Sequence, residues 1–464
     1  MEKIVLYPSP GIVHLTSMVE LGKLLLTHSS SISSIIILIP NNLPSITSSY
    51  SSYISSVSLS FPSITFISLP SVPLLNPSNY EDQQQLTLET IRNNNSNVLQ
   101  SLQSLSVSSP ISAFILSYPT LEISRSLNIP TFFFFTSSAS ALAFFLNFPV
   151  FDKITSEPYR NLKVSFEIPG LFSVPADHMI EPMLDRGVSY YEFIKMAETL
   201  PKCDGIIINT FESLEVKAMK ALKQGTCLPN TPLPPVYCIG PFIENHGDNS
   251  GENKDENQRH ECLKWLDSQP SKSVVYLAFG SKGVFSKEQL LEIAFGLEKS
   301  GVRFLWAVRA PSSQFESDLD SILPNGFLER TKDRGYIVKM WAPQIAVLGH
   351  ESVGGFVTHC GWKSTIEAVN AGVPLVAWPL YAEQRFNKIS LVEEIGIALP
   401  MNESEDRFVS SSEIEKRVKQ ILDSKDGDVI RKRILDLKAK ARNALNEGGS
   451  SYAALTTFVE SWKL

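Results

Sequence analysis

Short apolar runs alternate along this chain with longer stretches of helical periodicity, and this alternation limits the folds that are open to it. In the first half, the apolar run at residues 4–7 is followed by a helix-periodic stretch at 14–26 and a second apolar run at 35–39. This order is the strand, helix, strand pattern of parallel βαβ units. Further strands are expected in three later runs, at residues 64–67, 113–116 and 131–135. The first half therefore predicts a parallel α/β sheet.

Three other segments of the first half carry weaker patterns. Residues 80–105 are polar and periodic enough for a helix, whereas the Ser-rich residues 45–60 predict a surface loop because Ser is a poor helix former. Residues 132–148 are rich in Phe but include Ser, Thr and Asn, and Pro149 ends the run. A buried strand that leads into a buried helix is therefore favoured over a membrane-spanning helix.

The composition changes sharply at residues 241–260, which are rich in Glu, Asn, Asp, Gly and Lys and read as a linker. The alternation then resumes, and it predicts a second doubly wound α/β domain. Strands are expected at residues 274–279, 304–308, 337–340, 355–358 and 375–378, and helices at 288–299, 411–422, 429–447 and 450–462.

The length of 464 residues exceeds what one hydrophobic core usually supports, so two domains are expected. We predict an N-terminal domain at 1–240, the linker at 241–260 and a C-terminal domain at 261–447. The last helix, about 448–464, is expected to pack back on the first domain.

Charge and cysteine usage exclude several functions. The net charge of −7 provides no basic surface for nucleic acid or anionic membranes. The five cysteines are scattered without CxxC spacing, which indicates neither a disulfide framework nor a zinc site. The N-terminus has one Lys and a four-residue apolar run before Pro8, unlike a secretory signal. We expect a cytoplasmic protein with a small substrate.

The segment GGFVTHCGWKSTIEAVNAG carries the clearest chemistry. It predicts a strand at 355–358, a loop at 359–362, a helix from Lys363 and a helix stop at Gly372. Free amides and the dipole at the start of such a helix form an anion site suited to a diphosphate. His359 and Ser364 add hydrogen-bonding groups there, and Glu367 lies one turn further on, where it could accept from a ribose diol. By itself, this pattern leaves a purely structural role for His359 equally open.

The flanking segments add to the interpretation. WAPQIAVLGH at residues 341–350 offers an aromatic plane for a base, and WPLYAEQ at 378–384 ends a strand with a carboxylate and an amide. Residues 341–384 together resemble the signature box of plant family-1 UDP-glycosyltransferases, and the likeness extends over nearly the whole chain. The resemblance implies the α/β GT-B fold, in which two Rossmann-like parallel-sheet domains face each other across an interdomain cleft. It also implies an inverting transfer without a metal or other cofactor, from the co-substrate UDP-glucose.

The resemblance assigns donor-binding roles residue by residue. It implies that Trp341 stacks on uracil while the Ala342 backbone pairs with it, and that Gln344 and Glu367 hold the ribose. The diphosphate would be held by residues of the helix start and of the AFGS loop: Ser281, His359, Gly361, Trp362, Lys363 and Ser364. Glu383 and Gln384 would hold the sugar, with further sugar contacts from Thr136 and Trp378. Gln at the last position of the box usually accompanies glucose in this family.

In the first domain, PSPGIVHL resembles the family loop that carries the general base, here His14. An imidazole with a pKa near neutrality suits removal of the proton from the attacking hydroxyl. Without the resemblance, His14 would be read as an ordinary residue of an N-terminal helix.

Three positions depart from the family pattern. Ser117 stands where an aspartate usually orients the histidine, the following loop is shortened, and Glu122 is interpreted as a surface charge rather than a substitute partner. Lys363 replaces the usual asparagine, and either pairs with a bound diphosphate or forms an exposed pair with Glu367. Val13 replaces a glycine, which crowds the loop and removes its access to positive φ.

The leading hypothesis is an active, monomeric glucosyltransferase whose acceptor is a flavonoid or related phenol. Its acceptor pocket would be lined by residues 132–148 and 172–197. Two alternatives stay open: glycosylation of an activated aromatic carbon, and a catalytically impaired protein that binds UDP-sugar. A nicotinamide dehydrogenase is disfavoured because no strand is followed by GxGxxG with an acidic residue about 20 positions on.

Overall fold

The computed structural model describes residues 2–40, 48–74, 80, 83–118, 121–243, 260–309 and 322–463. The chain falls into two compact units, each with its own sheet. Unit 1 comprises Met1–Glu244 and Asn443–Leu464, and unit 2 comprises Asn245–Arg442. Most of the linker predicted at 241–260 lies outside the described residues.

Unit 1 contains a seven-stranded parallel sheet in the order β3-β2-β1-β4-β5-β8-β9. Its strands are β1 (Glu2–Tyr7), β2 (Ile32–Ile39), β3 (Ile64–Ser68), β4 (Ala113–Leu116), β5 (Thr131–Phe135), β8 (Gly205–Ile208) and β9 (Val236–Cys238). The predicted strands of the first half are thus confirmed, while β8 and β9 were not predicted. The short antiparallel pair β6 (Ser165–Phe166) and β7 (Val174–Pro175) stands apart from this sheet.

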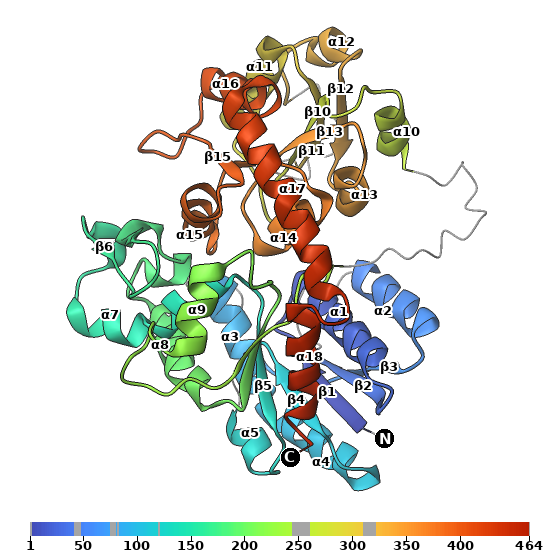
Figure 1. The fold of residues 1–464 in the computed structure, drawn as a ribbon, viewed down its shortest axis with the longest axis vertical. Helices are drawn as coiled ribbons and strands as arrows, with labels where there is room; N and C mark the ends of the chain where they lie inside the picture. The colour runs from blue at the N-terminus through green and yellow to red at the C-terminus, as the bar shows by residue number, and fades with distance from the viewer. Residues whose placement is uncertain are drawn as a thin grey trace. The chain divides into compact units, whose positions relative to one another are not determined.

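Helices cover both faces of this sheet (Figure 1). They are α1 (Ile12–His28), α2 (Ser48–Ser60), α3 (Gln83–Asn93), α4 (Asn95–Ser108), α5 (Leu121–Arg125), α6 (Ala139–Leu146), α7 (Phe148–Ile154), α8 (Val188–Thr199), α9 (Val216–Gln224) and α18 (Ser450–Glu460). Short 3₁₀ turns lie at Tyr159–Asn161, Ala176–His178, Glu181–Met183 and Leu200–Lys202. The core on one sheet face joins side chains of β1, β2, β4 and β5 to side chains of α1, α2 and α18.

The structure corrects two of the predictions for this unit. The loop expected at residues 45–60 is wrong over its described part, because α2 is a helix whose Tyr50 and Val57 are buried, with Tyr53 and Ile54 packed against the same core. Their i, i+3, i+4, i+7 spacing forms an apolar stripe that the surrounding serines obscure. The single helix expected at 80–105 is two helices, α3 and α4, which meet at the buried Asn94.

Unit 2 contains a six-stranded parallel sheet in the order β12-β11-β10-β13-β14-β15. Its strands are β10 (Val274–Ala278), β11 (Arg303–Val308), β12 (Gly335–Lys339), β13 (Val353–Thr358), β14 (Leu375–Ala377) and β15 (Ala398–Pro400). The expected strands are confirmed, and β15 was not predicted. One core cluster packs these strands against α11 and α16.

The helical segments of this region are α10 (Glu261–Asp267), α11 (Lys287–Ser300), α12 (Phe327–Thr331), α13 (Gln344–Leu348), α14 (Trp362–Ala371), α15 (Gln384–Ile389), a π-helical turn (Ser390–Glu394), α16 (Ser411–Asp423) and α17 (Lys425–Leu445). The helices expected at 288–299, 411–422 and 429–447 are confirmed as α11, α16 and α17. The helix expected at 450–462 is α18 of unit 1.

Candidate functional site

The carboxyl edge of the second sheet brings the predicted donor residues together. Loops after β10, β12, β13 and β14 carry Ser281, Trp341, His359 and the 378–384 segment respectively. Ligands of open α/β sheets bind at this edge because the loops there feed helix N-termini. Segments up to a hundred residues apart in the sequence thus contribute to one surface.

The loop between β13 and α14 leaves the start of the helix available to a ligand. Cys360 adopts a φ of 67°, which turns the chain, and Gly361 is the N-cap of α14 without a side-chain hydrogen bond to the first turn. Trp362, Lys363 and Ser364 form that first turn, in which Lys363 is half-buried. Amides at such an uncapped helix start favour an anionic group.

His359 lies in this loop, and its surroundings decide its charge. Its side chain is 7% exposed, and burial lowers its pKa from 6.5 to about 4. A Cβ atom at Gly280 would lie 2.5 Å from His359 Nε2, and one at Gly361 would lie 2.6 Å from it. Both positions therefore need glycine to leave room for the imidazole ring. Its Nδ1 has no hydrogen-bond partner in the described part of the chain. The ring is therefore a neutral, closely held imidazole with hydrogen-bonding capacity for a ligand.

Three predicted donor residues form one hydrogen-bonded group. Gln344 Nε2, from the first residue of α13, donates to Ser364 Oγ at 2.9 Å and to Glu367 Oε2 at 2.6 Å. Glu367 is buried in α14. These bonds place an amide and a carboxylate side by side next to the start of α14, which is the combination expected to bind a ribose diol.

Gln384 and Glu383 belong to the turn that enters α15. Gln384 is buried, and its Oε1 accepts hydrogen bonds from Leu380 N and Tyr381 N, both at 2.9 Å. Asn387 Nδ2 donates to Cys360 O at 3.0 Å and to Glu383 Oε1 at 3.4 Å. Asn387 thereby connects the predicted sugar-binding turn to the predicted diphosphate loop.

The three tryptophans of the box differ in exposure. Trp341 is 62% exposed, so its indole face is open to stacking, while the adjacent Ala342 is buried. Trp362 is 3% exposed and Trp378 is 1% exposed. Trp378 packs against Phe279 and Phe285 within the core of unit 2, which disfavours the predicted contact between its ring and a sugar.

The remaining predicted residues lie in unit 1, at the carboxyl edge of its sheet. His14 lies in the first turn of α1 after β1, Ser117 follows β4 and Thr136 follows β5. Because β1, β4 and β5 are neighbours in the sheet, the three residues share one edge. Gly11 precedes α1 with a φ of 127°, and its N–H donates to Tyr50 Oη at 3.0 Å.

The structure shows the exposure and the contacts of residues at or near the positions where the sequence departs from the family pattern. Val13 is exposed beside His14, and Glu122 is exposed in α5, as the surface-charge interpretation expects. Ser117 donates its backbone N–H to Tyr7 O at 3.2 Å. Its buried Oγ has no hydrogen-bond partner in the part of the chain that the structure describes.

Comparison with known proteins supplies the identification. A family model described as UDP-glucoronosyl and UDP-glucosyl transferase matches residues 235–437. UDP-glycosyltransferase 88B1 of Stevia rebaudiana is 47% identical over 99% of this chain and 98% of its own length. The chain belongs to the UDP-glycosyltransferase family.

Other relatives of this UDP-glycosyltransferase agree with that identification. Anthocyanidin 5,3-O-glucosyltransferase of a Rosa hybrid cultivar is 46% identical over 100% of this chain and 99% of its own. The solved structure of Phytolacca americana UGT2, complexed with UDP-2fluoro-glucose and pterostilbene, is 35% identical with a TM-score of 0.89 over 100% of both chains. With the two parallel sheets, this confirms the GT-B fold of two Rossmann-like domains.

Some residues at the donor edge of this UDP-glycosyltransferase were not predicted. Gly280, with a φ of 73°, makes room for His359, and Asn387 connects two loops. The signal for Gly280 was present in AFGS, because a glycine directly after a buried strand is typical of close backbone approach. Asn387 carried no local signal, since its closer partner, Cys360 O, lies in another loop.

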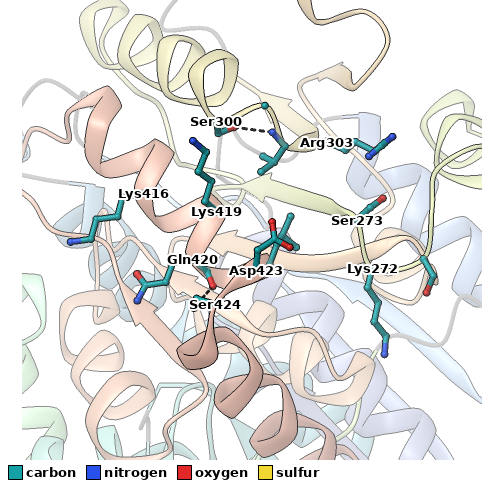
Figure 2. Close-up of a pocket in the computed structure, with 13 residues that line it drawn as sticks. Lys272, Ser273, Ser300, Arg303, Lys416, Lys419, Gln420, Asp423 and Ser424 are labelled. Atoms are coloured by element: carbon teal, nitrogen blue, oxygen red, sulfur yellow. Dashed lines mark hydrogen bonds between the residues drawn. The ribbon is translucent and has the colours of Figure 1, made fainter.

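A pocket of the UDP-glycosyltransferase, of about 870 Å³, lies away from these residues (Figure 2). It is lined by the segments before β10 and β11 and by the end of α16, including Lys272, Arg303, Lys419 and Asp423. These are the amino ends of the strands, opposite the edge that carries His359. The pocket is therefore not the predicted donor site.

No helix in the described part of the enzyme has the length and apolarity needed to cross a bilayer. Among the described residues, no group of three His, Cys, Asp or Glu side chains is arranged to hold a metal ion. All five cysteines are buried and free.

Proposed function

We propose that this UDP-glycosyltransferase transfers glucose from UDP-glucose to a phenolic hydroxyl of a flavonoid-like plant metabolite, with inversion at the anomeric carbon. The single observation that carries the donor part is the continuous carboxyl edge of unit 2, where a neutral His359 and the Gln344, Ser364 and Glu367 group surround the uncapped start of α14. The acceptor class is supported by the anthocyanidin-acting relative and by the neighbour bound to pterostilbene.

In this proposal, unit 2 binds the donor. Trp341 stacks on uracil, the Ala342 backbone pairs with its edge, and Gln344 and Glu367 hold the ribose, whose hydroxyls donate to the Glu367 carboxylate. The diphosphate is held by Ser281, His359 and the first turn of α14, and Glu383 and Gln384 hold the glucose hydroxyls. Negative charge that develops on the departing UDP is stabilised by helix amides oriented before the reaction begins.

Unit 1 binds the acceptor and supplies the base. His14 removes the proton of the acceptor hydroxyl, the oxygen attacks the anomeric carbon, and the bond from that carbon to the β-phosphate oxygen breaks on the opposite face. The transition state resembles the oxocarbenium ion of glycoside hydrolysis. Ser117 supplies no carboxylate to stabilise the His14 cation, so a phenol, with a pKa of about 10, suits this site better than an aliphatic alcohol.

The test is a comparison of the wild type with His14→Ala and His14→Gln, supplied with UDP-glucose and a panel of phenols. Wild-type turnover should give β-linked glycosides, and both variants should lose activity by roughly 10²–10⁴-fold, the usual contribution of a general base. UDP affinity, measured by calorimetry, should be unchanged because the proposed donor residues lie in unit 2.

The products and controls decide between this proposal and its alternatives. NMR that locates a C–C bond would establish aromatic C-glycosylation instead. UDP binding without any glycoside or sugar hydrolysis would establish an impaired UDP-sugar-binding protein. Unchanged turnover in His14→Ala would assign the base to another group. The proposal retains the expectation of a cytoplasmic monomer that needs no metal.

A further inference from the structure

One carboxylate in unit 1 joins three segments that are far apart in the sequence. Glu192 of α8 accepts a hydrogen bond from Tyr118 Oη at 3.2 Å and pairs with Arg92 of α3 at 2.5 Å. Tyr118 directly follows Ser117 at the end of β4. A single side chain on α8 therefore connects α3 to the segment that carries Ser117.

This group is partly protected from water. The Glu192 side chain is 19% exposed and the Arg92 side chain 53% exposed. Burial, together with the negative charge of Glu192, raises the pKa of Tyr118 above its usual value of 10. Tyr118 therefore stays protonated at neutral pH and continues to donate to the carboxylate.

The next residue of α8 holds the neighbouring strand. Phe193 packs against Phe145 of α6 with ring centroids 5.8 Å apart, and Phe145 packs against Phe135 at 5.8 Å. Phe135 ends β5 and precedes Thr136. Successive residues of α8 thus hold the segments that follow β4 and β5, through a charged contact and an aromatic contact respectively.

The described part of the segment after β4 is Ser117 and Tyr118, and each of them makes one hydrogen bond to another element. Ser117 is uncharged, and its backbone N–H already bonds to Tyr7 O. The backbone bond of Ser117 and the side-chain bond of Tyr118 therefore hold this pair of residues from two sides. Since β4 lies between β1 and β5, the pair shares its sheet edge with His14 and Thr136.

We infer that Glu192 is a positioning residue for the acceptor: by holding Tyr118 and Arg92 it fixes the segment after β4, and so the surface that orients a phenolic acceptor beside His14. This inference rests on the proposed function, because it concerns the orientation of the acceptor whose hydroxyl His14 deprotonates. It assigns no proton transfer to Glu192 itself.

The test measures KM for acceptor and for UDP-glucose separately in Glu192→Gln and Tyr118→Phe. Each variant should raise the acceptor KM roughly ten-fold, the effect of losing one hydrogen bond to a charged group. The KM for UDP-glucose should rise less than the acceptor KM, and the calorimetric affinity for UDP, which carries no glucose, should stay unchanged. Because Tyr118→Phe removes one oxygen atom and keeps the ring, it carries the test if Glu192→Gln does not fold.

Two controls separate positioning from general destabilisation. Glu212→Gln removes another ion pair of unit 1, the exposed pair of Lys223 and Glu212, which lies outside the proposed acceptor-lining segments, and should change neither KM. The double variant Tyr118→Phe/Glu192→Gln should be no worse than the single variants, because contacting residues that act through one interaction are not additive.

Several results would overturn the inference. These are an unchanged acceptor KM, an equal rise in both KM values, an equal effect of Glu212→Gln, or additive effects in the double variant. A wild type that glucosylates no phenol would instead refute the proposed function. The two failures are therefore distinguishable.

Discussion

Around the start of α14, the two basic side chains have different charge states. His359 is neutral near pH 7 because burial lowers its pKa to about 4, whereas Lys363 is a half-buried ammonium in the first turn. A cation at that position opposes the helix dipole by about 0.3–1 kcal/mol when no anion is present. A bound diphosphate reverses the sign, so Lys363 should act on donor affinity more than on stability.

We predict that Lys363→Asn weakens UDP binding roughly ten-fold at low salt, by removing one charge-assisted contact. The difference from wild type should shrink as ionic strength rises, because salt screens a partly exposed charge. Calorimetric titration at two salt concentrations measures both effects. Lys416→Asn, which removes an exposed cation elsewhere in unit 2, is the control. Equal or tighter UDP binding in Lys363→Asn would instead favour competition between Lys363 and the ribose for Glu367.

His359 should also make stability depend on pH. Its folded pKa of about 4 lies below the unfolded value of 6.5, so above about pH 6.5 the imidazole is neutral in both states. As the pH drops from 6.5 toward 4, the unfolded chain binds a proton that the folded chain does not, and the free energy of unfolding falls. The fall of the pKa from 6.5 to about 4 corresponds to roughly 3 kcal/mol. Urea unfolding at pH 7 and pH 4.5 should show a smaller pH effect in His359→Gln than in wild type. The more exposed His178→Gln should behave like wild type, and an unchanged pH effect in His359→Gln would refute this account.

A carboxylate restored at Ser117 should change the range of acceptors. Ser117→Asp places an acidic group at the sheet edge that carries His14, where it would stabilise the protonated imidazole. Activity on weakly acidic aliphatic alcohols should rise more than activity on phenols, because phenols depend less on the strength of the base. The ratio of kcat/KM values for a phenol and an alcohol is the measurement. Ser117→Asn is the uncharged control, and an equal gain on both acceptor types would count against the explanation.

At the scale of secondary-structure elements, α6 is placed by a carboxylate from a distant loop. Glu215 is 3% exposed and accepts from Ala139 N at 2.9 Å, from Ser140 N at 3.0 Å and from Ser140 Oγ at 2.9 Å. Ser138 Oγ accepts from Ala141 N at 3.0 Å. The start of α6 is thus satisfied by one local cap and one remote cap, and Thr136 lies in the short loop that leads into it.

Glu215→Gln should therefore cost more stability than loss of the local cap. Its amide NH₂ would face the N–H groups of α6 where a carboxylate oxygen now accepts, and an unsatisfied buried donor costs about 1–3 kcal/mol. Ser138→Ala should cost about 1 kcal/mol, as for other N-caps. Urea denaturation compares the two. A smaller loss for Glu215→Gln than for Ser138→Ala would mean that the remote cap contributes little.

At the scale of the whole chain, the last helix belongs to the unit that contains the first strand. Phe458 of α18 is fully buried and packs against Phe132 and Tyr237 at centroid distances of 4.9 Å and 5.0 Å. Trp462 Nε1 donates to Glu2 Oε2 at 3.0 Å. The two ends of the chain therefore meet within unit 1, and Figure 1 shows α18 in red beside strands coloured blue and cyan.

Phe458→Ala should destabilise unit 1 by about 3–5 kcal/mol, the usual cost of removing a buried aromatic ring. UDP affinity at a temperature where the variant is folded should be unchanged, since the proposed donor residues lie in unit 2. Thermal unfolding and calorimetry test the two parts. Substitution of the exposed Val107 by Ala provides a matched apolar control at the surface of unit 1. A loss of UDP affinity in Phe458→Ala would contradict the assignment of its effect to unit 1.

The order of most strands and helices follows from the sequence alone, because hydrophobic periodicity extends over a few residues and can be recognised within each segment separately. The sequence also identified residues 341–384 as a nucleotide-sugar box. The sequence-based prediction was wrong at α2, where four apolar residues among many serines form the buried stripe of a helix. It also missed the short strands β8, β9 and β15, whose identity depends on the sheet that receives them.

Only the tertiary structure decided the state of the side chains within that framework. The neutrality of His359 follows from the glycines and loops packed around it, and the burial of Trp378 follows from Phe279 and Phe285. In the Tyr118, Glu192 and Arg92 group, Glu192 contacts one residue 74 positions away and another still further away in the sequence. Burial, electrostatic environment and hydrogen-bond partners depend on segments that the local sequence does not contain, so no local pattern records them.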